Sequence, residues 1–419
     1  MSMSVQVPKG YKQTEVGVIP EDWLLVTAND VCDLVIDCKN RTPPFSESED
    51  YAVVRTPNVR DGKFVWSDLK FTDKKSFEIW TSRGVPSEGD ILITREAPLG
   101  EACLVPEKIN VCLGQRMMLY RPCALKINGQ YMLYAILSNN VQKTLFKKIG
   151  GSTVGHAKVD DIRYLQISMP NKLEEQQAIA EALSDADALI ESLEQLITKK
   201  RQVKQGAMQE LLTGQRRLPG FSGGWVVKRL EELADIRSGG TPSTSQPQFW
   251  DGDVLWCTPT DITALNGGKY IIETSRKITV AGLKASSAEI IPAGSIVMTS
   301  RATIGECAIN INPITTNQGF KNFVPFDSVD TEFLYYLLST QREGFVSLCS
   351  GSTFLEIGKN QLMTYEVIIP NEKSEQTAIA IILADMDKEI EGIEARLSKA
   401  RKIKQSMMQE LLTGRIRLI

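Results

Sequence analysis

Fifteen residues of this chain occur twice, almost unchanged, at an offset of 200 residues. KQGAMQELLTGQRRL begins at Lys204, and KQSMMQELLTGRIRL begins at Lys404. At the same offset the match extends back to Pro170 in the first copy and Pro370 in the second. A period this long does not suit a solenoid repeat, so we interpret the chain as a duplicated domain.

The last part of each copy predicts a long helix with a coiled-coil seam. Apolar residues recur at alternating steps of four and three, and lysines interrupt the seam at Lys200 and Lys204 in the first copy and at Lys404 in the second. Gly214 and Gly414 are natural left-handed caps. The seam residues are Ile179, Leu183, Ala186, Ile190, Leu193 and Ile197, and then Ile379, Leu383, Met386, Ile390, Ile393 and Leu397. A seam like this is often only a dimerisation device. Because a folded domain precedes each helix, we expect the two helices to pair internally and antiparallel, as a rod of about 60 Å.

The first part of each copy is rich in Val, Ile, Thr, Gly and Pro and reads as β structure. The alternating runs GDILIT from Gly89 and GSIVMT from Gly294 are followed by similar turns. The predicted fold class is α+β, with two β-rich domains separated by two long helices that form an antiparallel coiled coil. The expected boundaries are 1–170 for the first domain, 171–215 for its helix, 216–370 for the second domain and 371–419 for its helix.

Composition places the chain among ordinary globular proteins. The net charge is −3 and the sequence pI is about 5.6, so a basic nucleic-acid face has to be local. The eight cysteines form no CxxC pair, and no signal peptide is recognisable, so we expect reduced thiols in the cytoplasm. The apolar runs are too short for a membrane span, and no membrane association is expected.

The sequence lacks the common catalytic motifs. His156 is the only histidine, which disfavours histidine-based triads and most zinc chemistry, and we interpret it as a surface or capping residue. A phosphate-binding GxxxxGK[ST] loop is absent. NRTPPF at 40–45 resembles the Asn-Pro-Pro-Phe loop of amino-methyltransferases, but Thr42 replaces the residue that would bind the target amine. We therefore expect no catalytic residue, no bound metal and no bound cofactor. The remaining interpretation is a protein that binds a ligand and holds its two domains at a fixed spacing.

Duplex DNA is the commonest ligand with two sites at a fixed separation, and several side chains suit it. Arg95 and Arg301 lie in corresponding turns, Gln115 with Arg116 matches Gln318, and Lys321 follows. Arg is suited to guanine and Gln to adenine, while Ser and Thr commonly hold phosphates. The predicted DNA-binding residues in these turns are Thr94, Arg95, Gln115, Arg116, Thr299, Ser300, Arg301, Gln318 and Lys321. The alternative for each is a solvated surface residue or a turn former.

Two Gly-Ser-Thr segments add a second set of candidates. Ser152 and Thr153, with Lys158 nearby, and Ser352 and Thr353, with Lys359 nearby, could form phosphate-holding loops. A hydroxyl that caps a short helical turn explains the same residues equally well.

These features together resemble the specificity subunit of type I restriction-modification systems. The resemblance rests on the paired helices AIAEALSDADALIESLE and AIAIILADMDKEIEGIE, the paired MQELLTG, the GST segments, and the entries VIPEDW at Trp23 and FSGGW at Trp225. It covers essentially the whole chain and implies two target recognition domains that each read half of a bipartite DNA site. It also implies docking of two modification subunits, which bind S-adenosylmethionine and methylate adenine, and of two ATP-dependent restriction and translocase subunits. S-adenosylmethionine, ATP and Mg are therefore expected on the partner subunits.

Acidic residues on the two helices are candidates for contact with those partners, with a solvated helix face as the alternative. The predicted partner-binding residues are Glu174, Glu175, Asp185, Asp187, Glu375, Asp385 and Asp387. Three other functions stay open. They are the specificity subunit of a system that fuses nuclease and methylase, a coiled-coil scaffold that binds protein, and an unrecognised enzyme.

Overall fold

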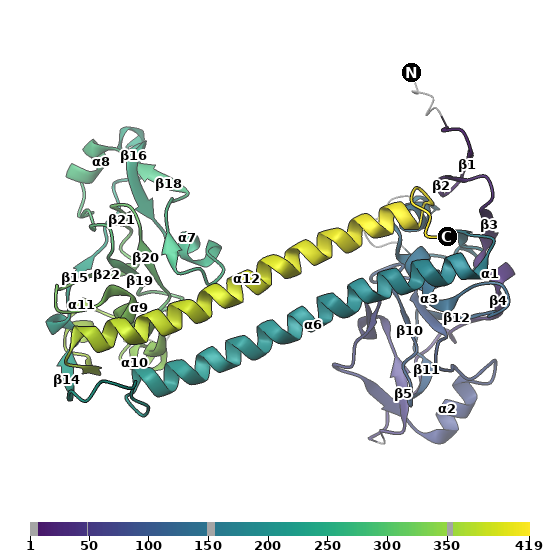
Figure 1. Cartoon of the computed structure of the whole chain (residues 1–419), viewed down its shortest axis with the longest axis horizontal. Helices are drawn as coiled ribbons and strands as arrows, with labels where there is room; N and C mark the ends of the chain where they lie inside the picture. The colour runs from purple at the N-terminus through teal and green to yellow at the C-terminus, as the bar shows by residue number, and fades with distance from the viewer. Residues whose placement is uncertain (1–6, 48, 149–155, 350–354) are drawn as a thin grey trace. The chain divides into compact units, whose positions relative to one another are not determined.

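The structure, a computed structural model, describes residues 7–47, 49–148, 156–349 and 355–419 (Figure 1). Two compact units make up the chain: residues 1–194 with 395–419 form unit 1, and residues 195–394 form unit 2. The two long helices are α6 (Leu173–Leu212) and α12 (Lys373–Leu411). Since the division falls inside both, each helix contributes one part to each unit.

Unit 1 is built on a four-stranded antiparallel sheet in the order β10-β9-β12-β4. Its strands are β4 (Cys32–Asp37), β9 (Ile91–Thr94), β10 (Ala102–Leu104) and β12 (Met117–Pro122). Ile91 and Ile93 pack on the helices, and Leu92 packs on a second sheet, β11-β5-β8. Because both faces are covered, β9 is buried along its whole length, and the alternation expected from GDILIT does not apply to it. The second sheet consists of β5 (Tyr51–Val54), β8 (Lys70–Thr72) and β11 (Asn110–Leu113).

Helices α3 (Gly129–Leu137) and α4 (Asn139–Lys148) cover the first sheet beside the start of α6. A hairpin precedes the sheet, and a two-stranded ribbon, β3 with β13, leads into α6. The remaining elements are β1 (Tyr11–Thr14), β2 (Gly17–Pro20), β3 (Leu24–Thr27), α1 (Ala28–Val31), β6 (Val59–Arg60), β7 (Lys63–Phe64), α2 (Lys74–Trp80), α5 (Val159–Arg163) and β13 (Gln166–Met169).

Unit 2 repeats this plan, with a central sheet in the order β15-β22-β19-β20-β17 and a second sheet in the order β18-β16-β21. Ile296 and Met298 of β19 face the helices, and Val297 faces the second sheet, as in β9. The strands are β14 (Trp225–Arg229), β15 (Ala234–Ser238), β16 (Trp250–Cys257), β17 (Tyr270–Ile271), β18 (Arg276–Ile278), β19 (Ile296–Thr299), β20 (Cys307–Asn310), β21 (Thr315–Thr316), β22 (Phe320–Pro325) and β23 (Glu366–Pro370). The helices are α7 (Pro259–Ala264), α8 (Val280–Lys284), α9 (Thr331–Thr340), α10 (Arg342–Ser347) and α11 (Lys359–Met363).

Within each unit the two long helices run antiparallel. In unit 1, Lys404 pairs with Asp187 at 2.6 Å and Arg401 pairs with Glu194 at 2.7 Å. In unit 2 the equivalent residues pair with the two helices exchanged: Lys204 pairs with Asp387, and Arg201 pairs with Glu394 at 2.6 Å. The predicted α+β fold with antiparallel helix pairing is confirmed. The two caps are confirmed as well, since Gly214 and Gly414 have φ of 72° and 68°.

One arginine closes the base of each helix pair. Arg417 holds Glu175 with two hydrogen bonds and also reaches Asp22 at 2.9 Å. Arg217 holds Glu375 with bonds of 2.7 and 2.8 Å. We call these contacts the basal clamps. They join the segment after each MQELLTG sequence to the first turn of the other long helix.

Two further features bear on the expectations from composition. Burial raises the pKa of the Cys103 and Cys112 thiols to about 12, so they act as packing residues. All eight cysteines are free thiols. Among the described residues, no helix combines the length and apolarity needed to cross a membrane.

Candidate nucleic-acid interface

The turn after β9 and the turn after β19 form the same corner of the two units. The Arg95 amide donates to the Arg116 carbonyl at 2.8 Å, and the Ser300 amide donates to the Gly319 carbonyl at 2.7 Å. These bonds place Ser300, and not Arg301, at the position of Arg95. Arg95 and Arg301 lie in corresponding turns of the two units, as expected, but Arg301 is one residue further along its turn than Arg95.

The threonines of this corner hold the turn together. Thr94 and Thr299 have no exposed surface. The Thr94 hydroxyl donates to the Pro98 carbonyl at 2.6 Å, and the Thr299 hydroxyl donates to the Thr303 carbonyl. Ser300 is also fully buried, and its hydroxyl has no hydrogen-bond partner. The prediction of phosphate contacts is therefore corrected for these three residues, because their hydroxyls are closed off from solvent.

A polar contact joins each corner to the segment that leads into α5 or α11, and its carboxylate lies on the turn in unit 1 and on that segment in unit 2. In unit 1, Glu96 lies 2.6 Å from Arg116 and 3.4 Å from His156. In unit 2, Arg301 lies 2.9 Å from Glu356. Both arginines thus have a carboxylate partner. Their side chains are nonetheless half exposed, so they stay candidates for DNA contact at a cost in rearrangement.

Each corner also contains a buried cation. Arg95 is 8% exposed, and its Nη1 lies 3.5 Å from the Ala157 carbonyl. Lys321 is 6% exposed, and its Nζ lies 3.4 Å from the Phe320 carbonyl. Desolvation lowers the pKa of Lys321, since burial penalises the charged ammonium. The interpretation of these two as surface contacts to DNA is therefore corrected: both cations lie beneath the surface.

The other DNA-binding candidates have mixed outcomes. Lys158 caps α5 and Lys359 begins α11, and both are exposed. Gln115 and Gln318 are exposed as well. Ser152, Thr153, Ser352 and Thr353 lie outside the described residues.

Two of the acidic residues predicted to bind partners are buried in the basal clamps. Glu175 is 3% exposed and Glu375 is 1% exposed, so neither carboxylate belongs to a solvated face. This corrects the prediction for both. Glu174, Asp185 and Asp385 are exposed.

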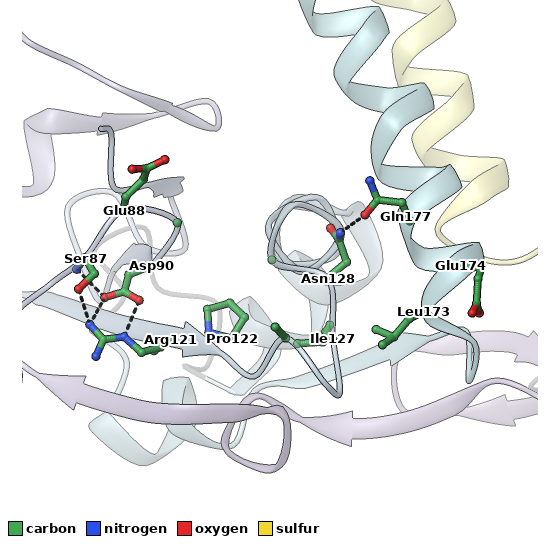
Figure 2. A pocket seen from close by; sticks show the side chains of 13 residues that line it. Ser87, Glu88, Asp90, Arg121, Pro122, Ile127, Asn128, Leu173, Glu174 and Gln177 are labelled. Atoms are coloured by element: carbon green, nitrogen blue, oxygen red, sulfur yellow. Dashed lines mark hydrogen bonds and ion pairs between the residues drawn. The ribbon is translucent and has the colours of Figure 1, made fainter. Parts of the chain in front are cut away.

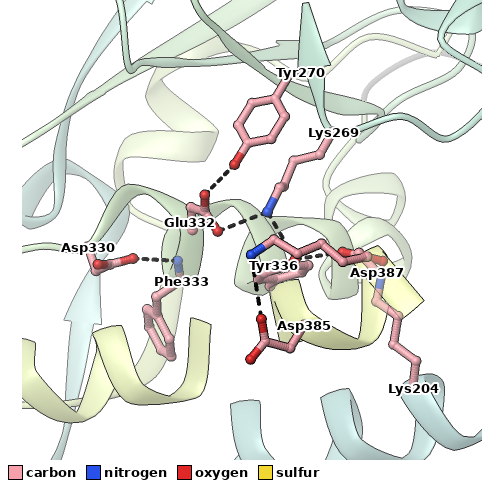
Figure 3. Close-up of polar contacts among 10 residues, drawn as sticks. Lys204, Lys269, Tyr270, Asp330, Glu332, Phe333, Tyr336, Asp385 and Asp387 are labelled. Atoms are coloured by element: carbon pink, nitrogen blue, oxygen red, sulfur yellow. Dashed lines mark hydrogen bonds and ion pairs between the residues drawn. The ribbon is translucent and has the colours of Figure 1, made fainter. Parts of the chain in front are cut away.

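Asp187 and Asp387 are half buried and belong to internal networks. Asp387 accepts from Lys204 and, at 2.6 Å, from the Tyr336 hydroxyl (Figure 3). The network continues through Lys269, which lies 3.2 Å from the Tyr336 hydroxyl and 2.8 Å from Glu332. In unit 1, Asp187 accepts from Lys404 at 2.6 Å and from the Tyr134 hydroxyl at 2.8 Å. Burial and the aspartate raise the pKa of both tyrosines above the ordinary range. Both aspartates therefore act inside the helix pair, which corrects their assignment to a free acidic face.

The exposed Glu174 lies at the edge of a cavity of about 670 Å³ in unit 1. Figure 2 shows Arg121 paired with Asp90 on one side and Leu173 and Glu174 on the other. Arg121 holds both oxygens of Asp90, at 2.9 and 2.7 Å, and so neutralises this buried carboxylate. Among the residues that the structure describes, no group of histidine, cysteine and carboxylate side chains has the makings of a metal site.

The comparison with protein families decides what this duplicated architecture is. The model of the family "type I restriction modification DNA specificity domain" matches residues 20–202 and 222–400, one match in each copy. The chain belongs to this family. Both specificity domains are thus accounted for, each with most of the long helix that follows it. The expectation of a non-catalytic type I specificity subunit is confirmed.

Known relatives agree with the assignment. The type I restriction enzyme MjaIX specificity subunit of Methanocaldococcus jannaschii is 41% identical over 170 residues, which is 40% of this chain and 39% of that protein. A putative MjaX specificity subunit of the same organism is 27% identical over 98% of this chain and 97% of its own length.

Two solved structures have a similar fold. A chain from a study of complex assembly and conformational transition of the type I R-M system has a TM-score of 0.60. It is 18% identical, over 95% of this chain and 99% of that one. The type I system S subunit from M. genitalium has a TM-score of 0.57 at 15% identity, over 98% and 99% of the two chains.

Sequence reasoning missed one part of the specificity domains. Thr42-Pro43 and Thr241-Pro242 occupy equivalent loops beside Gln115 and Gln318. The signal was present, because a Thr-Pro pair follows the first strand of the central sheet in both copies.

Proposed function

We propose that this protein is the subunit that reads a bipartite site in duplex DNA, with one half-site for each specificity domain. The observation that carries the proposal is the repetition of a complete unit, down to the same backbone bonds at the corner of the central sheet. Two similar readers in one chain suit two half-sites on one duplex. The exposed Gln115 and Gln318, beside equivalent loops, support this function.

We further propose that the paired helices set the gap between the half-sites. Helix α6 has 40 residues and α12 has 39, which corresponds to about 60 Å at roughly 1.5 Å per residue. The ion pairs between the helices recur in both units and oppose sliding of one helix along the other. A rod of fixed length is what a fixed spacing between half-sites requires.

The proposed partners are two modification subunits and two restriction and translocase subunits. The modification subunits would carry S-adenosylmethionine and methylate adenine, and the restriction subunits would use ATP and Mg. The exposed carboxylates of Glu174, Asp185 and Asp385 are the remaining candidates for acidic contacts with them. The cytoplasm, where DNA and reducing conditions coincide, is the proposed location.

The proposal is tested by incubating the full chain with its modification subunits and a library of random duplexes, and by sequencing the methylated products. The expected result is one motif with two short specified parts and an unspecified gap of constant length. Methylation without sequence preference would overturn the proposal, and so would a single continuous motif.

Two alternatives make different predictions in the same system. A specificity subunit whose partner fuses nuclease and methylase would give the same motif but would cut on both sides of it. A scaffold that binds only protein would show no DNA affinity at any salt concentration. A DNA reader instead loses affinity steeply between about 50 and 200 mM salt.

A further inference from the structure

The Thr-Pro loops bring together residues that lie far apart in the sequence. In unit 1, the backbone N–H of Gln115 donates to Thr42 Oγ1 at 3.3 Å. In unit 2, the Thr241 hydroxyl donates to Gln318 Oε1. The exposed glutamine of each domain is therefore anchored to this loop, although the bond differs between the units.

A tryptophan indole holds each loop from the other side. Trp80 Nε1 donates to the Arg41 carbonyl at 3.0 Å, and Trp256 Nε1 donates to the Gly240 carbonyl at 3.0 Å. The two carbonyls are equivalent, since each belongs to the residue before the threonine. The tryptophans come from different elements, α2 in unit 1 and β16 in unit 2. Tryptophans from two different elements thus make the same contact with the backbone. This indicates that each specificity domain needs this loop at a defined position.

An arginine lies over each tryptophan. The Arg41 guanidinium is 5.3 Å from the centre of the Trp80 ring. The Arg276 guanidinium is 3.8 Å from the centre of the Trp250 ring and 5.5 Å from that of Trp256. Both arginines are exposed. In the part of the chain that the structure describes, neither guanidinium has a hydrogen bond or an ion pair.

This distinguishes them from the arginines that sequence reasoning favoured. Arg116 and Arg301 have carboxylate partners at 2.6 and 2.9 Å, and Arg95 is buried. The guanidinium donors of Arg41 and Arg276 have no partner among the described residues, and the aromatic face limits the rotamers of the side chain. A guanidinium held in this way loses little conformational entropy when its N–H groups bind a ligand.

The loop of unit 2 is also closely packed against its surroundings. A Cβ on Gly239 would lie 1.9 Å from the Asn317 carbonyl oxygen, and one on Gly240 would lie 2.4 Å from the Ala288 nitrogen. Only glycine fits at either position. Arg276 lies over Trp256, whose indole donates to the Gly240 carbonyl, so its side chain projects beside this closely packed loop.

We propose that Arg276 and Arg41 are specificity-determining residues that each read a guanine in the half-site of their own domain. The inference rests on the proposed function and deepens it. Guanine presents N7 and O6 side by side in the major groove, and a guanidinium matches this acceptor pair with two hydrogen bonds. Lysine has the same charge but lacks the two parallel N–H donors of a guanidinium.

The experiment uses the full chain in complex with its modification subunits, as the parent protein and as Arg276→Ala and Arg276→Lys. Methylated random duplexes are sequenced for each, and thermal melting confirms that the variants fold. Both variants are expected to lose the preference for guanine at one position of one half-site by about 10- to 100-fold. The other half-site should be unchanged. Arg41→Ala should relax one position of that other half-site instead.

Arg229→Ala serves as the matched control. It removes an exposed arginine of the same unit that lies 3.8 and 3.9 Å from Glu231 and Glu366, and it should leave both half-sites intact. An unchanged motif in Arg276→Ala would overturn the inference. A uniform loss on all sequences that lysine restores would also overturn it, because that pattern indicates a phosphate contact. A parent complex without any preference would instead overturn the proposed function.

Discussion

At the scale of single residues, the two specificity domains keep one geometry with different chemistry. The carboxylate of the polar contact at the corner lies on the turn in unit 1, at Glu96, and on the following segment in unit 2, at Glu356. The buried cation is Arg95 on β9's turn in one unit and Lys321 on β22 in the other. Backbone bonds preserve the frame while the side chains around it vary. Such freedom is what the proposed reading of two different half-sites requires.

Lys321 gives a prediction about pH. Its folded-state pKa lies below the unfolded value of 10.5, so the folded state holds fewer protons and the free energy of unfolding rises with pH between the two values. Lys321→Met should remove this rise and increase the free energy of unfolding at pH 7 by about 1 kcal/mol, since it removes a buried charge. Urea unfolding at several pH values between 7 and 10 measures both effects.

The exposed Lys359 provides the control for Lys321. Lys359→Met removes the same charge from the surface and should leave the pH dependence of the parent protein. A loss of stability at pH 7 in Lys321→Met would show that the buried ammonium stabilises the fold.

At the scale of elements, charge determines the direction in which the long helices pair. The duplication places the same residue at positions 200 apart, so a parallel pair in register would bring Asp187 to Asp387 and Lys204 to Lys404. The antiparallel pair brings each aspartate to a lysine instead. The lysines that interrupt the apolar seam thus select one arrangement, a use of polar core positions known from coiled coils.

Removing Asp387 tests how much its contacts with Lys204 and Tyr336 contribute to the free energy of unfolding. Asp387→Ala should lower the free energy of unfolding by about 2 kcal/mol, because Lys204 and the Tyr336 hydroxyl both lose their charged partner. Asp385→Ala is the control two residues away. Asp385 is exposed and lies 3.5 Å from Lys388, so its loss should cost less than about 0.5 kcal/mol. Equal losses of unfolding free energy in the two variants, measured by urea unfolding, would contradict a special role for the contacts of Asp387.

The sequence predicted these helices well and the candidate site poorly, for a physical reason. Helical periodicity is local, so the seam and the capping glycines can be read from one window of residues. The role of Thr94 depends on the Pro98 carbonyl, and that of Glu175 depends on Arg417, 242 residues away. Burial of this kind follows from tertiary packing, which the pattern of letters does not contain. Arg276 was missed for the same reason, since Trp250 and Trp256 lie on a neighbouring strand.

At the scale of the whole molecule, the basal clamps make each unit depend on a distant segment. Arg417→Ala would leave Glu175 buried without its partner, and we expect a loss of about 3 kcal/mol in the stability of unit 1. Arg415→Ala is the control, because Arg415 is exposed and lies 3.4 Å from Glu410. Hydrogen exchange resolves the two units. Weaker protection confined to unit 2 would contradict the assignment.

The length of the helix pair gives a prediction about the DNA site. Seven residues inserted after Leu196 and seven after Arg396 fall between the ion pairs Glu194–Arg401 and Arg201–Glu394, so all pairs stay in place. Each helix lengthens by about 10 Å, close to three base pairs of duplex. The methylation motif should keep both half-sites and gain about three positions in the gap. A change in the half-sites themselves would show that the helices do not set the spacing.

The division of the chain into units also bears on how the protein folds during synthesis. Unit 2 is one continuous stretch, residues 195–394, whereas unit 1 needs residues 395–419 as well. The domain that leaves the ribosome first is therefore completed last. Until Arg417 emerges, Glu175 has no partner, and Leu411 and Leu412 are missing from the core around Ile179 and Leu183. A nascent chain of which only residues 1–394 have left the ribosome should display a finished unit 2 and an open unit 1, which is the state that chaperones would meet.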